Sequence, residues 1–396
     1  MKKASGAIII LLALSALLAS CQGGGRPGNK AATVPDDIVT YPEKAAMRLL
    51  TDRPPQLETP LRVFKQDFTP NEYFFVRWHM AQLVTKIDID TFRLYIGGAV
   101  NKTLALSLAD LKTKFPADSI VAVAVCAGNS RSTFEPKVPG SQWRSGGMGN
   151  AKWKGVKLKD ILAMAGLKPG AVEVTFQGMD KPTLPSTPAF IKSLDIAHAT
   201  DGEVMIAYEM NGAPIPMLNG YPLKLIVPGW YATYWVGALN TINVLSEKYT
   251  GFWMEKAYLI PANSGINETP DNVAKTRVPI SNIKLHAVFV APEPADTILA
   301  NKPCVVEGLV FNEGTPIQKV ELSLDNGKTW KDATLNPELG KYSWRRWKYS
   351  WTPAATGIYQ LKLKATDIKG NTEVETQWNK SGYARNFMEH LTVEVK

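Results

Sequence analysis

The feature that most constrains the fold is an apolar run that ends in a cysteine turn, Ile120-Val-Ala-Val-Ala-Val-Cys126-Ala-Gly-Asn-Ser-Arg131. Small and β-branched residues in succession are typical of a buried strand, and Gly-Asn predicts the turn that ends it. Gly128 allows the backbone to approach a ligand closely. A thiol at this strand end, with Arg131 nearby to stabilise a thiolate, suits a soft metal. The alternative is a buried structural cysteine, since free cysteine is often buried.

The size of the chain predicts two folded domains. It has 396 residues, of which 45% are hydrophobic, enough for sizeable cores. The net charge of +9 is compatible with nucleic acid, a membrane surface or a small anion as partner. No Lys/Arg run is interleaved with aromatic residues, so we do not expect nucleic-acid binding, and a basic pocket for a small anion needs fewer assumptions.

The N-terminus resembles a lipoprotein signal peptide over residues 1–21. Lys2 and Lys3 precede an apolar stretch at residues 7–19, and Leu-Ala-Ser-Cys21 resembles a lipoprotein cleavage box. We therefore expect a lipid anchor on Cys21 and a periplasmic, membrane-anchored protein, with 22–60 as tether and irregular lead-in. The alternatives are an uncleaved anchor and an ordinary secretory leader.

The two other cysteines, Cys126 and Cys304, fall in different predicted domains. A cysteine in a prepared turn of an exported protein serves chemistry or is deeply buried, and Cys304 is expected to be an inert core residue. The chain has no Cys-x-x-Cys-His motif, so we expect no covalently bound haem. Electrons from a redox reaction would then have to leave for another protein.

Several charged residues stand at the ends of apolar strands. Arg77 and His79 follow an apolar run and would share one strand face, which predicts an anion or phosphate site; the alternative is a surface pair flanking Trp78. Asp180 ends the predicted strand 172–180, where it could bind a ligand nitrogen or cap a turn. Lys224 lies inside an apolar strand, so it either reaches solvent or meets an anion.

The helices expected in the first half follow local signals. Ser107 is a predicted cap, residues 157–165 a predicted helix, and Ser193 a predicted helix start. The glycine-rich stretch 146–155 is interpreted as a loop that lacks either nucleotide fingerprint. Residues 247–260 are expected to be extended, with Tyr258 near their end.

A polar, Pro- and Asn-rich stretch at 261–282 is interpreted as a linker. Strands recur at short spacing beyond it, with an Asp-Asn-Gly hairpin turn at 325–327 and few helical signals. We therefore predict an α+β chain in which a mixed α/β catalytic domain, residues 61–270, precedes an all-β immunoglobulin-like sandwich, residues 283–396.

Several segments, in order, resemble the sulfite oxidase family of molybdenum enzymes, and the likeness runs from about residue 60 to the end. The matching segments are Val76-Arg77-Trp78-His79, Cys126-Ala-Gly-Asn-Ser-Arg131, Met148-Gly-Asn-Ala-Lys-Trp153-Lys-Gly, Ala207-Tyr-Glu-Met-Asn-Gly212, Gly220-Tyr-Pro-Leu-Lys-Leu-Ile-Val-Pro-Gly229, Leu322-Ser-Leu-Asp-Asn-Gly327-Lys-Thr-Trp330 and Tyr342-Ser-Trp-Arg-Arg-Trp347. The last two resemble the family's dimerisation domain, so the resemblance implies a homodimer.

The resemblance also implies a role for each candidate site residue. Cys126 would bind molybdenum that is otherwise held by the dithiolene of a pyranopterin cofactor (molybdopterin). The cofactor itself would be held by polar and charged side chains: His79, Asn150, Asp180, Asn219 and Lys224. The substrate cavity would be lined by Tyr258, Arg77, Arg131 and Arg385.

The reaction implied by the resemblance is oxygen-atom transfer from molybdenum to sulfite, which gives sulfate. Two electrons would then leave one at a time to a separate c-type cytochrome. Alternatives within this class act on a sulfane sulfur or a sulfoxide. An alternative from another class is a surface-binding lipoprotein that keeps the fold without the cofactor.

The chain departs from the family pattern at several positions. Asn219 and Lys224 stand where many relatives carry His and Arg, and Gly237-Ala238 replaces a usual Lys-Trp. Lys2-Lys3 also does not fit the twin-arginine leader that exported relatives commonly use. These departures bear on how the cofactor phosphate is neutralised and on the export route.

Overall fold

The structure, a computed structural model, describes residues 38–293 and 296–396. The predicted signal peptide, with Cys21, lies outside the described residues. None of the helices in the described ranges is long and apolar enough to cross a bilayer.

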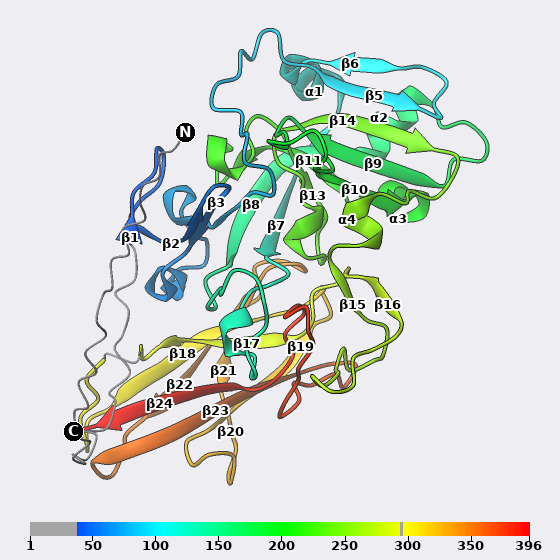
Figure 1. The fold of residues 1–396 in the computed structure, drawn as a ribbon. Coiled ribbons are helices and arrows are strands. Elements are labelled where there is room, and N and C mark those ends of the chain that lie inside the picture. Colours follow the sequence, from blue (N-terminus) through cyan, green and yellow to red (C-terminus); the bar gives the residue numbers. More distant parts are fainter. Residues whose placement is uncertain (1–37, 294–295) are drawn as a thin grey trace, which may run out of the picture. The chain divides into compact units, whose positions relative to one another are not determined.

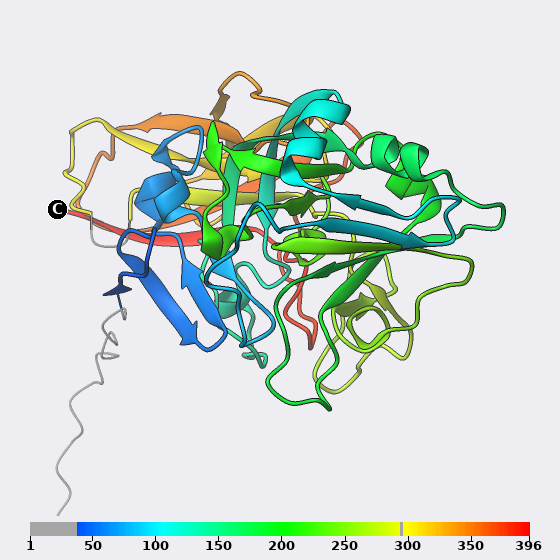
Figure 2. The same ribbon diagram turned by 90° about the horizontal axis from the view of Figure 1, so that it is seen from above.

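The first sheet takes three of its four strands from the stretch before residue 60 that was expected to be irregular. It has the order β1-β2-β3-β4, with bounds Ile38–Val39, Met47–Asp52, Pro55–Glu58 and Val76–Arg77. Figures 1 and 2 both draw β1 to β3, in blue, apart from the cyan and green sheets. The prolines suggested an irregular stretch, and this prediction was wrong. Pro54 lies in the turn before β3, where its missing N–H removes no hydrogen bond from the sheet.

The catalytic domain contains a five-stranded sheet with the order β10-β9-β14-β5-β6. Its strands are Ile191–Asp195, Glu173–Gly178, Leu239–Leu245, Leu94–Gly98 and Leu104–Leu106. The β14 and β5 strands pair in parallel, and the other neighbours are antiparallel.

A second sheet carries the cysteine. Its order is β12-β11-β8-β7, with β13 also paired to β11; the bounds are Ala213–Pro214, Met205–Met210, Met148–Lys157, Ala117–Val125 and, for β13, Lys224–Ile226. The β7 strand includes the predicted buried run and ends one residue before Cys126. Short 3-10 helices next to the sheets are η1 (Leu61–Lys65), η2 (Asn71–Tyr73), η3 (Arg131–Thr133), η4 (Met217–Asn219) and η5 (Ala232–Tyr234).

The glycine-rich stretch 146–155 is mostly strand β8, not the expected loop. A Cβ on Gly149 would lie 2.7 Å from the Phe74 ring, and one on Gly155 would lie 2.0 Å from the Ile206 carbonyl oxygen. These glycines therefore allow close packing against neighbouring segments. Their spacing alone could not distinguish this role from that of a ligand loop.

Two helices confirm the predictions from capping and periodicity. Helix α1 (Leu108–Lys114) has a capping box between Ser107 and Asp110. Helix α2 spans Leu158–Ala165 and buries its apolar face.

Two other predictions in this domain were wrong. The helix expected at Ser193 begins later, because strand β10 continues to Asp195, which caps α3 (Ile196–Thr200). The stretch predicted to be extended before Tyr258 contains a short helix, α4 (Phe252–Glu255).

The predicted linker is an ordered connection. Strands β15 (Leu259–Pro261) and β16 (Arg277–Pro279) pair antiparallel, and between them Glu268 accepts from the Arg277 guanidinium and the Lys380 backbone. The stretch is polar because its side chains bond one another and the C-terminal segment.

The C-terminal domain is an all-β sandwich, which confirms the predicted fold class. One sheet has the order β17-β18-β22-β21, with bounds His286–Ala291, Cys304–Phe311, Arg345–Trp351 and Thr334–Leu335. The other has the order β20-β19-β23-β24, with bounds Lys331–Asp332, Ile317–Ser323, Gly357–Asp367 and Glu389–Val395. A shared apolar core includes Trp347 from the first sheet and Leu363 from the second, and Cys304 is half-buried beside it. Figure 1 draws these strands in yellow to red.

Candidate active site

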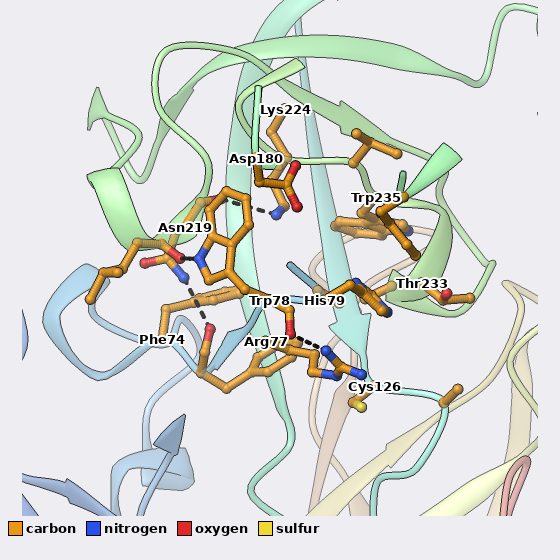
Figure 3. A pocket seen from close by; sticks show the side chains of 18 of the residues that line it. Phe74, Arg77, Trp78, His79, Cys126, Asp180, Asn219, Lys224, Thr233 and Trp235 are labelled. Atoms are coloured by element: carbon orange, nitrogen blue, oxygen red, sulfur yellow. Dashed lines mark hydrogen bonds between the residues drawn. The ribbon is translucent and has the colours of Figure 1, made fainter. Parts of the chain in front are cut away.

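One cavity of the catalytic domain collects most of the predicted site residues. Its lining includes Arg77, His79, Cys126, Asp180, Asn219, Lys224 and Tyr258. In Figure 3 the Cys126 thiol and the Arg77 guanidinium lie at one end, and Asp180 and Lys224 lie at the other. The cavity therefore has a thiol end and an ammonium end.

The cysteine turn places a free thiol at the cavity wall. The Cys126 backbone donates to the Gly147 carbonyl at 2.9 Å, and its own carbonyl accepts from Asn129 at 2.9 Å. Burial raises the pKa of the Cys126 thiol, while the charges of Arg77 and Arg131 oppose the rise. The free thiol is therefore protonated at neutral pH, and a bound metal would displace its proton.

Three polar side chains meet beside this thiol. Arg77 donates to the Tyr258 hydroxyl at 3.2 Å, and the same hydroxyl lies 2.5 Å from His79 Nε2. Burial, together with the charge of Arg77, holds the pKa of His79 well below its ordinary value. A neutral His79 can accept the phenol proton, which fixes the direction of the Tyr258 hydroxyl.

Tyr258 is held in a backbone conformation that the sequence does not reveal. Its φ is 59°, in the left-handed region, which is uncommon for a non-glycine residue. Burial raises the pKa of its phenol. Left-handed residues of this kind cluster at functional sites because the surrounding structure must hold them in place.

Asn219 forms hydrogen bonds with three groups at the ammonium end. Its side-chain oxygen accepts from the buried Lys44 ammonium, its amide donates to the Phe75 carbonyl at 3.0 Å, and its own carbonyl accepts from Lys224 at 3.0 Å. Both polar atoms of the Asn219 side chain thus have a partner within the protein. No pattern around Lys44 indicated this contact in the sequence.

Lys224 and Asp180 are the charged groups at this end. Burial lowers the pKa of Lys224 to about 8. Burial also raises the pKa of Asp180 from its ordinary 3.8 to about 6. Both shifts reflect a charge removed from water without a full counterpart in the protein, so each charge is available to a bound polar group.

The Asp180 carboxyl predicts a pH dependence of stability. Because its pKa is higher in the folded state, the folded protein binds the proton more tightly than the unfolded chain does. The carboxyl therefore contributes most to the free energy of unfolding below about pH 4, and this contribution is lost as pH rises through about 6. Without cofactor, the Asp180→Asn variant should be more stable than the parent at pH 8, by at most about 3 kcal/mol, and equal to it at pH 4. Urea unfolding at both pH values measures this, and a difference independent of pH would contradict it.

The structure does not place Asn150 in the cavity. It lies within β8, and its amide donates to the Asp67 carbonyl at 3.0 Å and to the Ser343 hydroxyl at 2.9 Å. Asn150 therefore joins the catalytic domain to the β domain. The resemblance assigned Asn150 to the cofactor, but it is not among the residues that line the cavity.

The two other predicted arginines also lie outside the cavity lining. Arg131 donates to the Ser141 and Gly382 carbonyls and stacks on the Tyr383 ring, 4.9 Å from its centroid. Its charge still lowers the pKa of the Cys126 thiol, although its guanidinium is bonded to backbone carbonyls outside the cavity lining.

Arg385 is used in a buried polar cluster. It pairs with Glu389 at 2.8 Å and contacts His286 at 2.9 Å. Its Nε donates to the Thr133 hydroxyl at 3.0 Å, in the 3-10 helix after the cysteine turn. Arg385 therefore supports that segment and is not among the residues that line the cavity.

Sequence analysis missed three residues around the cavity. Thr233 lines it with a hydroxyl that has no hydrogen-bond partner among the described residues. Tyr383, from the C-terminal segment, stacks on Tyr258 with ring centroids 5.3 Å apart. Lys192 is fully buried behind Tyr258. The stretch around Thr233 had no assignable pattern, and the other two arrive through tertiary contacts.

The arrangement has a definite chemical capacity. The thiol end can bind a soft metal and place an oxyanion against Arg77 and Tyr258. The other end can hold a polar, anionic group through Lys224, Asp180 and Thr233.

Comparison with known families gives matches to both domains. Residues 80–253 match the oxidoreductase molybdopterin binding domain, and residues 277–388 match the Mo-co oxidoreductase dimerisation domain. Together the two matches extend over most of the described chain.

Individual proteins are similar over most of this chain. Mitochondrial sulfite oxidase of Homo sapiens is 32% identical over 377 residues, covering 91% of this chain and 67% of the human protein. The Rattus norvegicus protein is 32% identical over 368 residues, covering 88% and 66%. The chain thus spans about two thirds of the length of these relatives.

Among solved structures, the sulfane dehydrogenase SoxCD from Paracoccus pantotrophus has the same fold. The TM-score is 0.76 at 22% sequence identity, and the match covers 93% of each chain. The likeness supports the architecture of a mixed α/β domain followed by an all-β domain.

Proposed function

This chain belongs to the sulfite oxidase family of molybdopterin oxidoreductases, and on that premise we propose that it oxidises sulfite to sulfate and passes the electrons to a separate c-type cytochrome. The observation that carries the proposal is the Arg77 and Tyr258 pair at the thiol end of the cavity. A guanidinium and a phenol beside a metal-binding thiol suit a small oxyanion.

The residues present fit a molybdenum pyranopterin. Cys126 offers the thiolate, and the Thr233 hydroxyl, which lacks a partner within the described residues, is a polar group that a ligand can satisfy. Lys224 would neutralise the cofactor phosphate, and Asp180 would accept from pterin N–H groups. When bound, the cofactor supplies oxygen-atom transfer and two-electron redox chemistry.

The protein's own side chains position the substrate. Arg77 binds the oxyanion through its charged fork and also holds the Tyr258 hydroxyl. His79, kept neutral by burial and by nearby positive charges, orients the same hydroxyl from the other side. Because all three groups are largely shielded from water, their electrostatic interactions with an anion are strengthened.

The cellular setting is part of the same proposal. An export signal ending at Cys21 supports a periplasmic protein held by a lipid anchor. The match of residues 277–388 to a dimerisation domain supports a homodimer.

A steady-state assay tests the substrate. Purified protein with its cofactor should reduce ferricyanide or cytochrome c when sulfite is supplied, with molybdenum present in elemental analysis. Turnover of a sulfoxide or a sulfane sulfur without turnover of sulfite would move the chain to another reaction of its family. Protein from its native compartment that lacked molybdenum would instead support a cofactor-free binding role.

A further inference from the structure

Lys192 is a buried cation without a role in the proposed reaction. It lies in β10, an edge strand of the five-stranded sheet, and it is 0% exposed. Its ammonium donates to the Trp253 carbonyl at 2.8 Å. Burial lowers the pKa of Lys192 to about 7, and no carboxylate among the described residues offsets the effect.

Lys192, like Lys224, is a buried ammonium whose lowered pKa no carboxylate offsets, whereas two buried arginines of the described chain have carboxylate partners. Arg277 pairs with Glu268 at 3.0 Å, and Arg385 pairs with Glu389 at 2.8 Å. A buried charge without such a partner costs stability, and groups of this kind are concentrated at functional sites. An anion bound in the cavity would supply a negative charge to this layer.

The Lys192 ammonium lies directly behind the substrate end of the cavity. It is 4.3 Å from the centroid of the Tyr234 ring and 5.4 Å from that of Tyr258. The Tyr258 hydroxyl in turn contacts Arg77 and His79. Lys192 also contributes to the lowered pKa of His79, so its charge acts across this layer of side chains.

We propose that Lys192 is a specificity-determining positioning residue, and that its protonated ammonium behind Tyr258 makes the site at Arg77 prefer dianions to monoanions. The inference rests on the proposed function, since it concerns how the same site chooses its oxyanion. Lys192 does not line the cavity, so it acts through the field in the cavity and through the placement of the Tyr258 ring. Coulomb energy is proportional to the product of the charges, so removing one positive charge should weaken a dianion twice as much, in free energy, as a monoanion.

The test compares sulfate and nitrate as unreactive probes of the holoprotein, by isothermal titration calorimetry at fixed ionic strength and at pH 6, below the lowered pKa of Lys192. In the Lys192→Met variant, sulfate should bind about 25-fold more weakly and nitrate only about 5-fold more weakly. In Lys192→Gln, which keeps a donor for the Trp253 carbonyl, the same difference should appear if the Met variant does not fold.

A matched control separates charge from packing. The Tyr234→Phe variant disturbs the hydrogen bond from the Tyr234 hydroxyl to the Ile280 carbonyl, 2.7 Å, but keeps the ring and the Lys192 charge. It should leave the ratio of sulfate to nitrate affinity unchanged.

Equal losses for sulfate and nitrate in the Lys192 variants would overturn the inference, because a purely structural role weakens both probes alike. Absence of sulfate binding to the parent would overturn it as well. The proposed function fails separately: if sulfite is not oxidised while the charge-dependent loss is seen, the reaction assignment is wrong and the anion preference of Lys192 stands.

Discussion

Replacing Cys126 by serine is expected to reduce sulfite turnover at least about 1,000-fold, because the hydroxyl is a poor substitute for the thiolate that would bind the metal. The free energy of unfolding should change by only about 1–2 kcal/mol, since serine is nearly the same size and the backbone bonds of the turn remain. The kcat of purified variant and the thiolate-to-metal absorption of its holoprotein measure the effect.

Cys304 provides the matched control for this substitution. It is half-buried in the β domain, outside the cavity, so Cys304→Ser should keep both turnover and the absorption band. Near-normal turnover of Cys126→Ser would show that the thiol is a structural residue and that the metal site has been misplaced.

Replacing Arg77 by methionine should lower kcat/KM for sulfite by about 100-fold to 1,000-fold, mainly through a higher KM. Methionine keeps much of the side-chain volume but removes the charge and the bond to the Tyr258 hydroxyl. Steady-state kinetics over a range of sulfite concentrations separate the two parameters, and Arg77→Lys should recover part of the loss because it restores the charge without the fork.

An exposed arginine tests whether this effect is local. Arg62 lies at the surface in η1, and Arg62→Met should leave kcat/KM unchanged. A wild-type KM in Arg77→Met would remove Arg77 from the proposed substrate site.

The predictions that held depend on short stretches of chain. The apolar run before Cys126 became the buried end of β7, an edge strand that pairs with β8, because small and β-branched residues favour a buried strand. The Ser107 capping box and the helix at 158–165 likewise follow from neighbours within a few residues. The repeated short strands after residue 283 were enough to predict a sandwich.

The predictions that failed depend on distant contacts. Glycines such as Gly149 and Gly155 suggested a loop. In the structure, the Phe74 ring and the Ile206 backbone approach so closely that there is no room for a side chain at either position. Arg131 follows Cys126 closely in the chain, yet sequence distance does not say that its guanidinium turns toward Gly382.

By itself, the sequence determined the order of the two domains, the strand that ends at Cys126 and the residue types at Arg77, His79 and Lys224, because backbone pattern and side-chain chemistry are local properties. Which charged side chains line the cavity, and which bond other groups of the protein, became clear only from the tertiary structure. The Lys192 ammonium contacts the Tyr258 ring, and Lys44, from a distant part of the chain, donates a hydrogen bond to the Asn219 side chain. Burial, hydrogen-bond partners and the electric field in a cavity arise only when segments far apart in the chain converge, so no local pattern encodes them.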